Sequence, residues 1–328
     1  MAFKIIASAT YLPKTIITSS ELDQRLNLKP GTCSKRYGVQ HRHFANFEET
    51  AVFMGCEAIK QALIDANLAL MDIDLLISAS GTSHQVLPYN GASILAELKD
   101  SHPIASMDIN SSCLSFLSAL DMAHCAIDSG RYKRILIVTS EVARVGITYD
   151  NPEISSLFAD GAAAFILEAD SESQGLVSSL FKTYPQGYEH CQIRSGGSFL
   201  HPSKTDLQTM VEGSYFYMDG KKVFKQVATL IKGFLDEGLQ KAKLNKQDIQ
   251  YIVPHQASHL GLKHIESRLG FKTQPMINII STMGNQIAAS IPIALDHLIK
   301  NHKPEKGSKI LIIGSGAGLS LGMGVLSL

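Results

Sequence analysis

The sequence predicts a layered α/β protein in which one α/β unit occurs twice. Short apolar runs at 75–79 and 135–138 are typical of strands buried on both faces, and apolar stripes of helical spacing alternate with such runs. The same order of turn, apolar helix and strand also occurs in each half of the chain. The predicted architecture is a duplicated α/β/α/β/α stack of layers, with two central sheets and with helices between and outside them.

The first half of the chain contains two predicted helices and the strands beside them. Apolar residues at helical spacing predict one helix over 50–67 and a second over 113–129, which Gly130 ends. Strand-like segments at 107–109 and 135–138 precede and follow the second helix. The order in this half is therefore strand, small-residue turn, apolar helix and strand.

The second half repeats that order. A small-residue turn leads into an apolar helix over 285–298, and a strand begins at Ile310. This strand follows Asn285 by 25 residues, and in the first half Ile135 follows Cys113 by 22 residues. Similar spacing in the same order indicates an internal duplication.

The boundary between the halves is predicted near the middle of the chain. Strands of small and then apolar residues close the two halves at 161–167 and 322–326, and the polar stretch 170–175 follows the first of them. No linker rich in Pro, Gly and Ser divides the sequence. We therefore expect two halves of similar fold, residues 1–172 and 173–328.

Composition and charge exclude several classes of protein. Of the 328 residues, 45% are hydrophobic and 18% are charged, which provides for a large core and excludes disorder, collagen and coiled coil. Lys and Arg number 30, as do Asp and Glu, so the chain lacks the basic excess of a protein that neutralises nucleic-acid phosphates. We expect a globular enzyme or binding protein that acts on no nucleic acid.

Cysteine usage and the termini indicate a cytoplasmic protein. The five cysteines are odd in number and include no CxxC pair, so we expect neither a disulfide framework nor a metal site. The N-terminus lacks a long apolar region followed by a cleavage site, which argues against export. The segment 310–328 has no charged residue, but its Gly and Ser content predicts two buried strands and a glycine turn rather than a membrane span.

Cys113 is the candidate nucleophile. It follows a strand-like segment and a turn, and it opens the predicted helix, where free N–H groups and the helix dipole lower a thiol pKa and can hold an oxyanion. From position alone, an inert buried cysteine is an equally good interpretation. The remaining cysteines lack this setting and are expected to be structural: Cys33, Cys56, Cys125 and Cys191.

A histidine and an asparagine occupy similar positions in the second half. His255 directly follows the strand-like segment 251–253, where it could donate a hydrogen bond into a pocket, and Asn285 precedes an apolar helix. In isolation, His255 is one of twelve histidines and Asn285 is an ordinary helix N-cap. Neither residue by itself predicts a function.

Together the three residues resemble the Cys–His–Asn triad of the β-ketoacyl-[acyl-carrier-protein] synthase III family. Cys113 lies in Ser-Ser-Cys-Leu-Ser-Phe, His255 in Pro-His-Gln-Ala, and Asn285 in Gly-Asn-Gln-Ile-Ala-Ala-Ser-Ile-Pro. Further segments that look like those of the family are 37–44, 158–164 and 218–225. The resemblance covers most of the chain and implies the thiolase fold, which agrees with the duplication predicted from the pattern.

The resemblance also implies a reaction. An acyl thioester would acylate Cys113, and a malonyl thioester would lose carbon dioxide and attack that acyl group to give a 3-oxoacyl thioester. His255 and Asn285 would donate hydrogen bonds to the enolate oxygen, while backbone N–H groups of Cys113 and near Gly318 would hold the tetrahedral oxyanion. Coenzyme A or an acyl carrier protein would carry the substrates, with no resident cofactor, and the partner's segment 81–89 would close the acyl pocket of a homodimer.

Residues that bind the substrate or carrier are expected around this site. Arg36 and Arg42, from a basic segment, are expected to contact the nucleotide of coenzyme A or an acidic carrier protein. By resemblance, Lys225 and Arg268 are expected to help dock the carrier, and Ser258 occupies the place of the Asn that usually ends the Pro-His-Gln-Ala-Asn motif.

Departures from the family pattern leave alternatives open. The chain contains no Trp, although the family uses one to stack on the adenine of coenzyme A, and Leu260 replaces a carrier-docking arginine. The main alternative is an acyltransferase or non-decarboxylative condensing enzyme of secondary metabolism that uses the same acyl-Cys113 intermediate. A non-catalytic partner subunit is disfavoured, because all three triad residues are retained.

Overall fold

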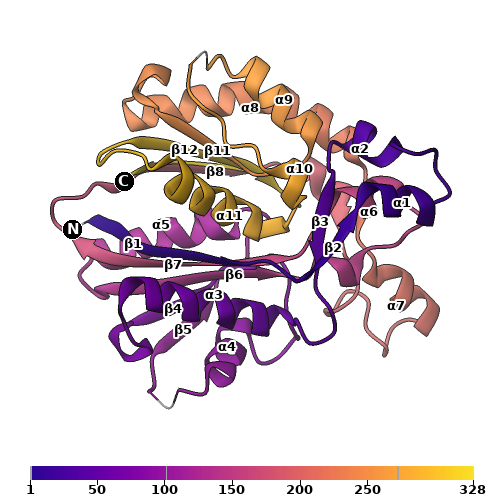
Figure 1. The fold of residues 1–328 in the computed structure, drawn as a ribbon, viewed down its shortest axis with the longest axis horizontal. Coiled ribbons are helices and arrows are strands. Elements are labelled where there is room, and N and C mark those ends of the chain that lie inside the picture. Colours follow the sequence, from indigo (N-terminus) through magenta and orange to yellow (C-terminus); the bar gives the residue numbers. More distant parts are fainter. Residues whose placement is uncertain (1, 101, 272) are drawn as a thin grey trace.

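Two stacked sheets with helices between and outside them form the body of the protein (Figure 1). The computed structural model describes residues 2–100, 102–271 and 273–328. From one face to the other, the layers are α8 and α9, the second sheet, α5 and α11, the first sheet, and α3 and α4. This arrangement confirms the predicted α/β/α/β/α stack.

The first sheet has five strands in the order β1-β7-β6-β4-β5. They are β1 (Ala2–Tyr11), β7 (Gly161–Asp170), β6 (Arg134–Glu141), β4 (Leu75–Ser78) and β5 (Ala105–Asp108). Strand β4 is parallel to both β5 and β6, whereas β7 is antiparallel to β6 and β1. The parallel strands β4, β5 and β6 therefore end at the same edge of the sheet.

The second sheet has four strands in the order β11-β12-β13-β8. They are β11 (Tyr251–Pro254), β12 (Lys309–Gly316), β13 (Ser320–Ser327) and β8 (Gly175–Thr183). Strands β11 and β12 are parallel, and β13 turns back antiparallel to β12. The interpretation of the uncharged C-terminal segment as two buried strands is confirmed. In the described residues, no helix has the length and apolar character needed to cross a membrane.

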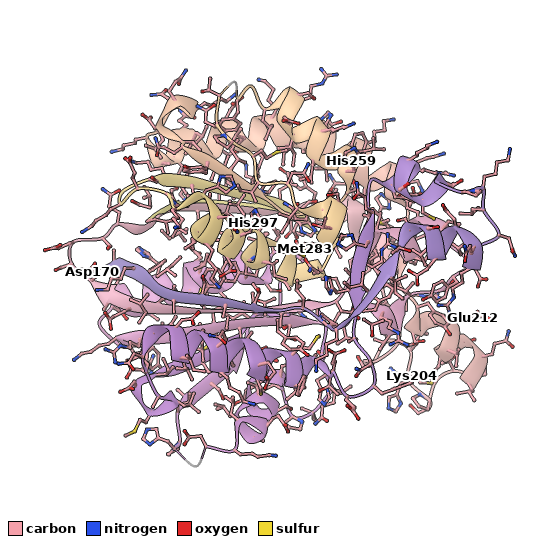
Figure 2. The ribbon with its side chains drawn as sticks, viewed as in Figure 1. Asp170, Lys204, Glu212, His259, Met283 and His297 are labelled. Atoms are coloured by element: carbon pink, nitrogen blue, oxygen red, sulfur yellow. The ribbon has the colours of Figure 1, made fainter. Side chains whose placement is uncertain are left out.

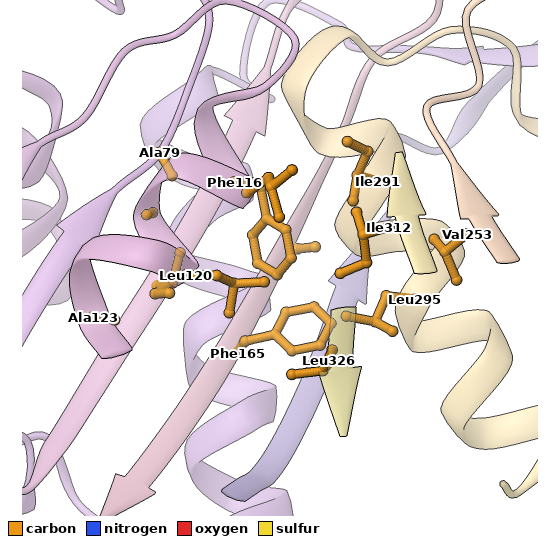
Figure 3. Packing of buried hydrophobic residues seen from close by; sticks show 14 of the residues in the cluster. Ala79, Phe116, Leu120, Ala123, Phe165, Val253, Ile291, Leu295, Ile312 and Leu326 are labelled. Atoms are coloured by element: carbon orange, nitrogen blue, oxygen red, sulfur yellow. The ribbon is translucent and has the colours of Figure 1, made fainter. Parts of the chain in front are cut away.

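The central layer consists of α5 (Ser115–Asp128) and α11 (Ser290–His297). Figure 3 shows their apolar side chains meeting others from both sheets, and Phe116 lies 5.0 Å from Phe165 between ring centroids. Both helices begin later than predicted, because the residues before them are held in turns. Asn285, for example, forms a β-bridge with Phe158 and cannot be helical.

The outer helices cover the far faces of the two sheets. Helices α3 (Ala51–Ala66) and α4 (Asn90–Leu98) cover the first sheet, and α8 (Gly220–Ala242) and α9 (His259–Arg268) cover the second. The helix predicted over 50–67 is confirmed as α3, whose N-cap Thr50 accepts a hydrogen bond from the backbone of Phe53.

Shorter elements gather at one end of the stack, on the right of Figure 1. Figure 2 shows Lys204 and Glu212 at this end, near α7, and Asp170 at the other. The short helices are α1 (Ser19–Arg25), α2 (Thr32–Tyr37), α6 (Pro152–Leu157), α7 (Leu207–Ser214) and α10 (Ile280–Met283). Two small sheets pair β2 (Thr15–Thr18) with β3 (His41–Phe44) and β9 (Cys191–Gln192) with β10 (Tyr217–Met218). Elsewhere in the chain, the 3-10 helices are η1 (Leu70–Asp72), η2 (Ala143–Gly146), η3 (Pro185–His190), η4 (Lys246–Asp248) and η5 (Ile287–Ala289), and η6 (Leu298–His302) is a short π-helix.

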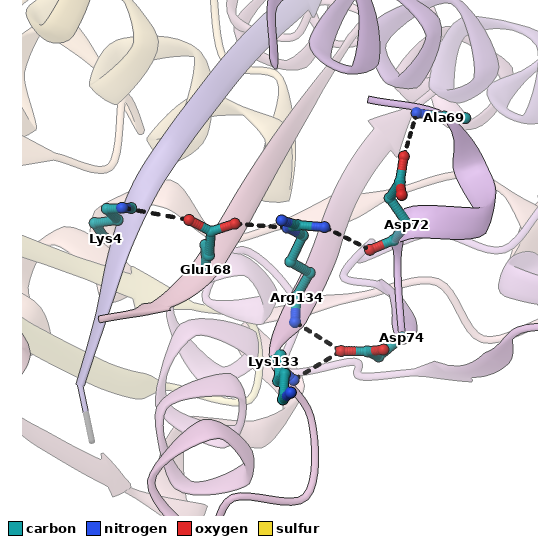
Figure 4. Close-up of polar contacts among 7 residues, drawn as sticks. All are labelled: Lys4, Ala69, Asp72, Asp74, Lys133, Arg134 and Glu168. Carbon is teal, nitrogen blue, oxygen red and sulfur yellow. Dashed lines mark hydrogen bonds and ion pairs between the residues drawn. The ribbon is translucent and has the colours of Figure 1, made fainter. Parts of the chain in front are cut away.

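A chain of polar contacts ties together the strands of the first sheet where β6 begins (Figure 4). Glu168 on β7 accepts from Arg134 Nε at 2.6 Å and lies 3.3 Å from Lys4 Nζ on β1. The hydrogen bond from Arg134 is the main cause that lowers the pKa of Glu168. Asp74 accepts from the backbone N–H groups of Lys133 and Arg134. These contacts fix the start of β6, and its other end reaches the candidate site.

The two-part division of the chain follows the sheets. The last strand of the first sheet ends at Asp170, and the first strand of the second begins at Gly175. We propose that residues 1–172 and 173–328 are the two copies of one ancestral α/β unit.

Replacing Phe116 by Ala tests how far the central layer determines stability. Phe116 is fully buried, so Phe116→Ala should lower the free energy of unfolding by about 3–5 kcal/mol, measured by denaturant titration. Met122→Ala is the control on the same helix, because Met122 is 48% exposed, and it should change stability by no more than about 0.5 kcal/mol. Equal losses in the two variants would contradict this account of the core.

Candidate active site

A cavity of about 650 Å³ brings the three predicted catalytic residues together. Cys113 from the first half and His255 and Asn285 from the second all line it. Each lies just after a strand or just before a central helix, so their positions follow from the layer packing described above. The cavity is therefore the candidate active site.

Cys113 lies in a strained turn before α5. Ser112 has φ of +56°, which is unfavourable for a residue with a side chain, and its N–H donates to Asn110 Oδ1 at 2.9 Å. The two N–H groups after Cys113, those of Leu114 and Ser115, bond back to the carbonyls of Ser111 and Ser112. This turn directs Cys113 into the cavity two residues before the helix begins.

The Cys113 thiol is less acidic than the sequence predicts. Burial is the largest influence and raises its pKa to about 11, while Ser112 and the N–H groups of Ala317 and Cys113 itself act in the opposite direction. The prediction of a lowered pKa is wrong, because the cost of burying the charge exceeds the help from the helix end. In the free protein, Cys113 is a neutral thiol at pH 7.

His255 follows β11 and is held from two sides. Its backbone N–H donates to the carbonyl of Ile313, and its Nδ1 lies 2.5 Å from Ser290 Oγ on α11. Burial lowers the pKa of His255 to about 4, so the ring is neutral at pH 7. When the Ser290 hydroxyl donates to Nδ1, the single ring proton resides on Nε2. The ring can then act as a neutral hydrogen-bond donor.

The Asn285 amide is oriented by its neighbours. Its Oδ1 accepts from the N–H of Ile287 at 2.9 Å, and its Nδ2 donates to the carbonyl of Ala257 at 3.2 Å. Backbone bonds to Leu157 and Ala159 anchor the same residue. One amide hydrogen thus remains for a ligand in the cavity.

The turn between β12 and β13 supplies a second backbone donor near Cys113. A Cβ on Gly316 would lie 3.2 Å from Ser111 O and 3.6 Å from Cys113 N, so this turn packs tightly against the nucleophile's turn. The N–H of Ala317 is the one that stabilises a Cys113 thiolate. The sequence predicts this donor near Gly318, and Ala317, the residue before it, is the neighbour whose N–H contacts the thiol.

Arg42 is a correction to the sequence analysis. Its side chain is fully buried, and its guanidinium donates to Ser19 Oγ at 3.0 Å and to the carbonyl of Ser156 at 2.9 Å. Burial lowers the pKa of Arg42 to about 10. Because the side chain is fully buried and both terminal nitrogens bond inside the protein, Arg42 braces β3 against α6 and cannot contact a substrate or carrier.

The other predicted binding residues lie on the surface or at the cavity. Ser258 lines the cavity and caps α9 by accepting from the N–H of Gly261. Lys225 is exposed on α8, next to Phe224, which lines the cavity. Arg36 and Arg268 are exposed at the ends of α2 and α9.

Sequence reasoning missed Ser290 and Ala317. Ser290 is the partner of the His255 ring, and its signal was a lone hydroxyl within an otherwise apolar helix that lies in the Asn285 motif. Ala317 acts through its backbone, which its side-chain identity does not reveal. Within the described part of the chain, no group of three or more His, Cys, Asp and Glu side chains could hold a metal ion.

Family models and relatives match this chain over most of its length. The model of 3-oxoacyl-[acyl-carrier-protein] synthase III matches residues 107–185, and the model of the C-terminal part of that enzyme matches 239–328. The chain is 30% identical over 330 residues to β-ketoacyl-[acyl-carrier-protein] synthase III of Psychromonas ingrahamii and 29% identical over 322 residues to that of Aquifex aeolicus. In each comparison, 98% of both chains is covered.

Solved structures show the same fold. The structure of 3-oxoacyl-[acyl-carrier-protein] synthase III from Aquifex aeolicus aligns with a TM-score of 0.88 at 28% identity, covering 99% of this chain and 100% of the other. The priming β-ketosynthase of the R1128 polyketide pathway aligns with a TM-score of 0.89 at 26% identity, covering 100% and 96%.

The buried state of His255 predicts a pH effect on stability. The pKa of His255 is lower in the folded protein than in the unfolded chain. Between about pH 6.5 and 4, the ring is therefore protonated in the unfolded chain but stays neutral in the folded protein. The wild-type protein should therefore lose about 3 kcal/mol more unfolding free energy over this range than His255→Gln does. Denaturant titrations at several pH values measure the difference, and His102→Gln, which removes an exposed histidine, is the control. Parallel curves for the wild-type protein and His255→Gln would contradict a buried neutral ring.

Proposed function

This chain belongs to the β-ketoacyl-[acyl-carrier-protein] synthase III family, and on that premise we propose that it is a condensing enzyme acting through an acyl-Cys113 intermediate. It takes an acyl group from an acyl thioester and joins it by decarboxylative Claisen condensation to a malonyl thioester, which gives a 3-oxoacyl thioester. The observation that carries the proposal is the convergence of Cys113, His255 and Asn285 on one cavity from two halves of the chain.

In the first half-reaction, Cys113 Sγ forms a bond to the thioester carbonyl carbon. The carbonyl oxygen becomes negative and receives hydrogen bonds from the N–H groups of Cys113 and Ala317, which also stabilise the thiolate. The carbon–sulfur bond of the donor then breaks, and the departing thiol takes the proton that Cys113 gave up. A thiol with a pKa of about 11 needs this stabilisation as the bond forms.

In the second half-reaction, the malonyl thioester loses carbon dioxide and its electron pair forms an enolate. The Nε2–H of His255 and the free amide hydrogen of Asn285 donate to the enolate oxygen. The enolate carbon then attacks the acyl carbonyl, and Cys113 leaves as a thiolate that regains a proton. The neutral state of His255 suits this role, because a neutral ring can donate a hydrogen bond from Nε2 and keep its proton.

The cavity lining favours an apolar, uncharged acyl group. Its walls include Val142, Ile147, Leu157, Phe158 and Phe216, and none of the lining residues is a Lys or Arg. A negatively charged acyl terminus would be desolvated there without a Lys or Arg partner. A malonyl carboxylate would be destabilised for the same reason, which favours its loss as carbon dioxide. We propose thioesters of coenzyme A or a carrier protein as donors.

Docking of an acidic carrier fits the surface around the cavity. Lys225 lies beside the cavity-lining Phe224, and a Cβ on Gly38, the C-cap of α2, would overlap the His259 side chain at the start of α9. Arg36, near the end of α2, therefore lies close to α9, whose cap Ser258 lines the cavity. Lys225, Arg36 and Arg268 are the proposed cationic contacts.

A homodimer in the cytoplasm is part of the same proposal. Val86 and Leu87, in the segment expected to close a partner's pocket, are 71% and 81% exposed, and β5 is an edge strand of the first sheet. Exposed apolar residues beside an open sheet edge favour burial by a second copy. The five cysteines are unpaired, which is typical of a reducing compartment.

Mass spectrometry of the intact protein tests the intermediate. Incubation with a panel of acyl-CoAs should add one acyl group on Cys113, and malonyl-CoA or malonyl-carrier protein should then remove it with release of carbon dioxide equal to product. Cys113→Ala should take up no acyl group, whereas Cys125→Ala, which changes an exposed cysteine, should load like the wild-type protein. Asn285→Ala should still load but condense about 100- to 1,000-fold more slowly. An adduct that malonyl thioesters leave untouched would favour the acyltransferase alternative instead.

Light scattering in solution tests the dimer. Leu87→Asp should shift the mass from two chains toward one, because a charge in the proposed interface is costly to bury. Ile64→Asp is the matched control, since Ile64 is 70% exposed on α3, away from the loop, and should leave the mass unchanged. A wild-type protein with the mass of one chain would refute the dimer.

A further inference from the structure

Glu141 is a buried carboxylate that the proposed chemistry does not use. It is the last residue of β6 and has no exposed surface. It receives three hydrogen bonds from the segment that follows β4. The N–H of Gly81 donates to its Oε1 at 2.5 Å, while the N–H and hydroxyl of Thr82 donate to its Oε2 at 3.1 and 2.5 Å. Gly81 and Thr82, which line the cavity, separate Glu141 from it.

The segment that Glu141 holds lies between the turns of two catalytic residues. A Cβ on Gly81 would lie 2.9 Å from Ile287 Cγ2 and 3.3 Å from the backbone of Ser112, so Gly81 is packed between them. Ser112 directly precedes Cys113, and Ile287 follows Asn285 by two residues. Any shift of Gly81 would therefore move one or both turns.

Hydrogen bonds connect this segment to the nucleophile's turn. The Gly81 carbonyl accepts from Asn110 Nδ2 at 3.3 Å, and Asn110 Oδ1 accepts from the N–H of Ser112 at 2.9 Å. One residue earlier, the Ser80 carbonyl accepts from Ser115 Oγ, and the Ser80 hydroxyl accepts from the N–H of Ser140, next to Glu141. The end of β6 is thus linked to both sides of Cys113.

The carboxylate also faces the asparagine's turn. Burial raises the pKa of Glu141 to about 7, and the N–H of Ala288 is one of the donors that oppose this rise by stabilising the carboxylate. Ile287, just before Ala288, has φ of +52°. In the same turn, the Ile287 N–H donates to Asn285 Oδ1, the bond that orients the catalytic amide. An acceptor at Glu141 therefore helps to hold the conformation that aims Asn285 into the cavity.

We propose that Glu141 is a positioning residue that clamps Gly81 and Thr82 between the turns of Cys113 and Asn285 and so sets the geometry of both. The assignment rests on the proposed function of those two residues. Glu141 touches no substrate, so it should affect the rate of reaction more than substrate affinity.

Glu141 has a second, electrical effect on Cys113. Its negative charge is among the causes that raise the pKa of the thiol. The other titratable groups lining the cavity are Glu153 on α6, His190 on η3, Cys191 on β9 and His255 after β11, and all of them remain in the variants below. A change in thiol acidity can then be traced to Glu141.

Four variants separate the effect of the hydrogen bonds to Glu141 from the effects of its charge and of general stability. Glu141→Gln removes the charge and points an amide N–H₂ at the backbone donors, whereas Thr82→Val removes one hydrogen bond and keeps the charge. Glu49→Gln is the matched control: Glu49 is 3% exposed and likewise receives two backbone N–H bonds, from Lys14 and Asn46, and one hydroxyl bond, from Tyr11. Thr82→Ser retains the hydroxyl and should rescue the loss seen in Thr82→Val.

Single-turnover acylation of Cys113 by the acyl-CoA that loads fastest is the first readout, followed by steady-state condensation and thermal melting. Glu141→Gln should lower the acylation rate and kcat by about 10- to 100-fold with little change in KM, and Thr82→Val should show a smaller loss. Glu49→Gln should keep the wild-type rates even if its melting temperature falls as far as that of Glu141→Gln.

Alkylation of Cys113 by iodoacetamide across a pH series is the second readout and needs no substrate. Its pH profile should move to lower pH in Glu141→Gln, because the nearby charge is gone, and should stay in place in Thr82→Val and Glu49→Gln. In Glu141→Gln, we therefore expect a Cys113 thiol that is more acidic but is acylated more slowly, because the hydrogen bonds that hold Gly81 and Thr82 are weakened.

Two results would overturn the assignment. One is wild-type acylation in both Glu141→Gln and Thr82→Val; the other is an equal rate loss in Glu49→Gln, which would make Glu141 a stabilising residue only. If Glu141→Gln does not fold, Thr82→Val and its rescue by Thr82→Ser decide the question. If the wild-type protein takes up no acyl group, the proposed function fails, and the alkylation profile of Glu141→Gln still supports or refutes the contact with Cys113.

Discussion

The site depends on two central helices being buried between two sheets. Helices α5 and α11 pack against both sheets, so neither can slide without opening the core. The turns before them carry Cys113 and Asn285, and the parallel strands β4, β5, β6, β11 and β12 end near the same cavity. Residues after those strands supply Gly81, Asn110, His255 and the turn with Ala317. This follows the general rule that ligands bind beyond the carboxyl ends of parallel strands.

Burial also sets the charge state of the site. It raises the pKa of Cys113 to about 11 and lowers that of His255 to about 4, so both groups are neutral at pH 7. Burial thus disfavours an ion pair between a thiolate and an imidazolium before the substrate arrives. Stabilisation of negative charge is left to fixed donors, the N–H groups of Cys113 and Ala317 and the side chains of His255 and Asn285. Such donors are already oriented when charge develops on the substrate.

Strained backbone occurs at three positions of the cavity lining. Ser112, Ile287 and Leu319 all have positive φ without being glycine, and all three line the cavity. Each costs folding free energy, so the surrounding structure must hold it in place. For Ser112 and Ile287, that structure includes the segment bound by Glu141, and for Leu319 it includes Gly187, where a Cβ would lie 2.3 Å from the Leu319 Cβ. Geometry at the site is therefore maintained by contacts between segments distant in sequence.

The sequence by itself determined the layer architecture and the identity of Cys113, His255 and Asn285, because apolar periodicity and short motifs are local properties of the chain. It also predicted α3 and the two C-terminal strands. Only the tertiary structure showed that Arg42 is buried, that the N–H of Ala317 lies beside the thiol, and that the thiol pKa rises. The same holds for Ser290 and Glu141, whose partners lie 35 and about 60 residues away. Burial and long-range contacts decide these properties, and neither can be read from neighbouring residues, since both arise only when the two sheets close around the central helices.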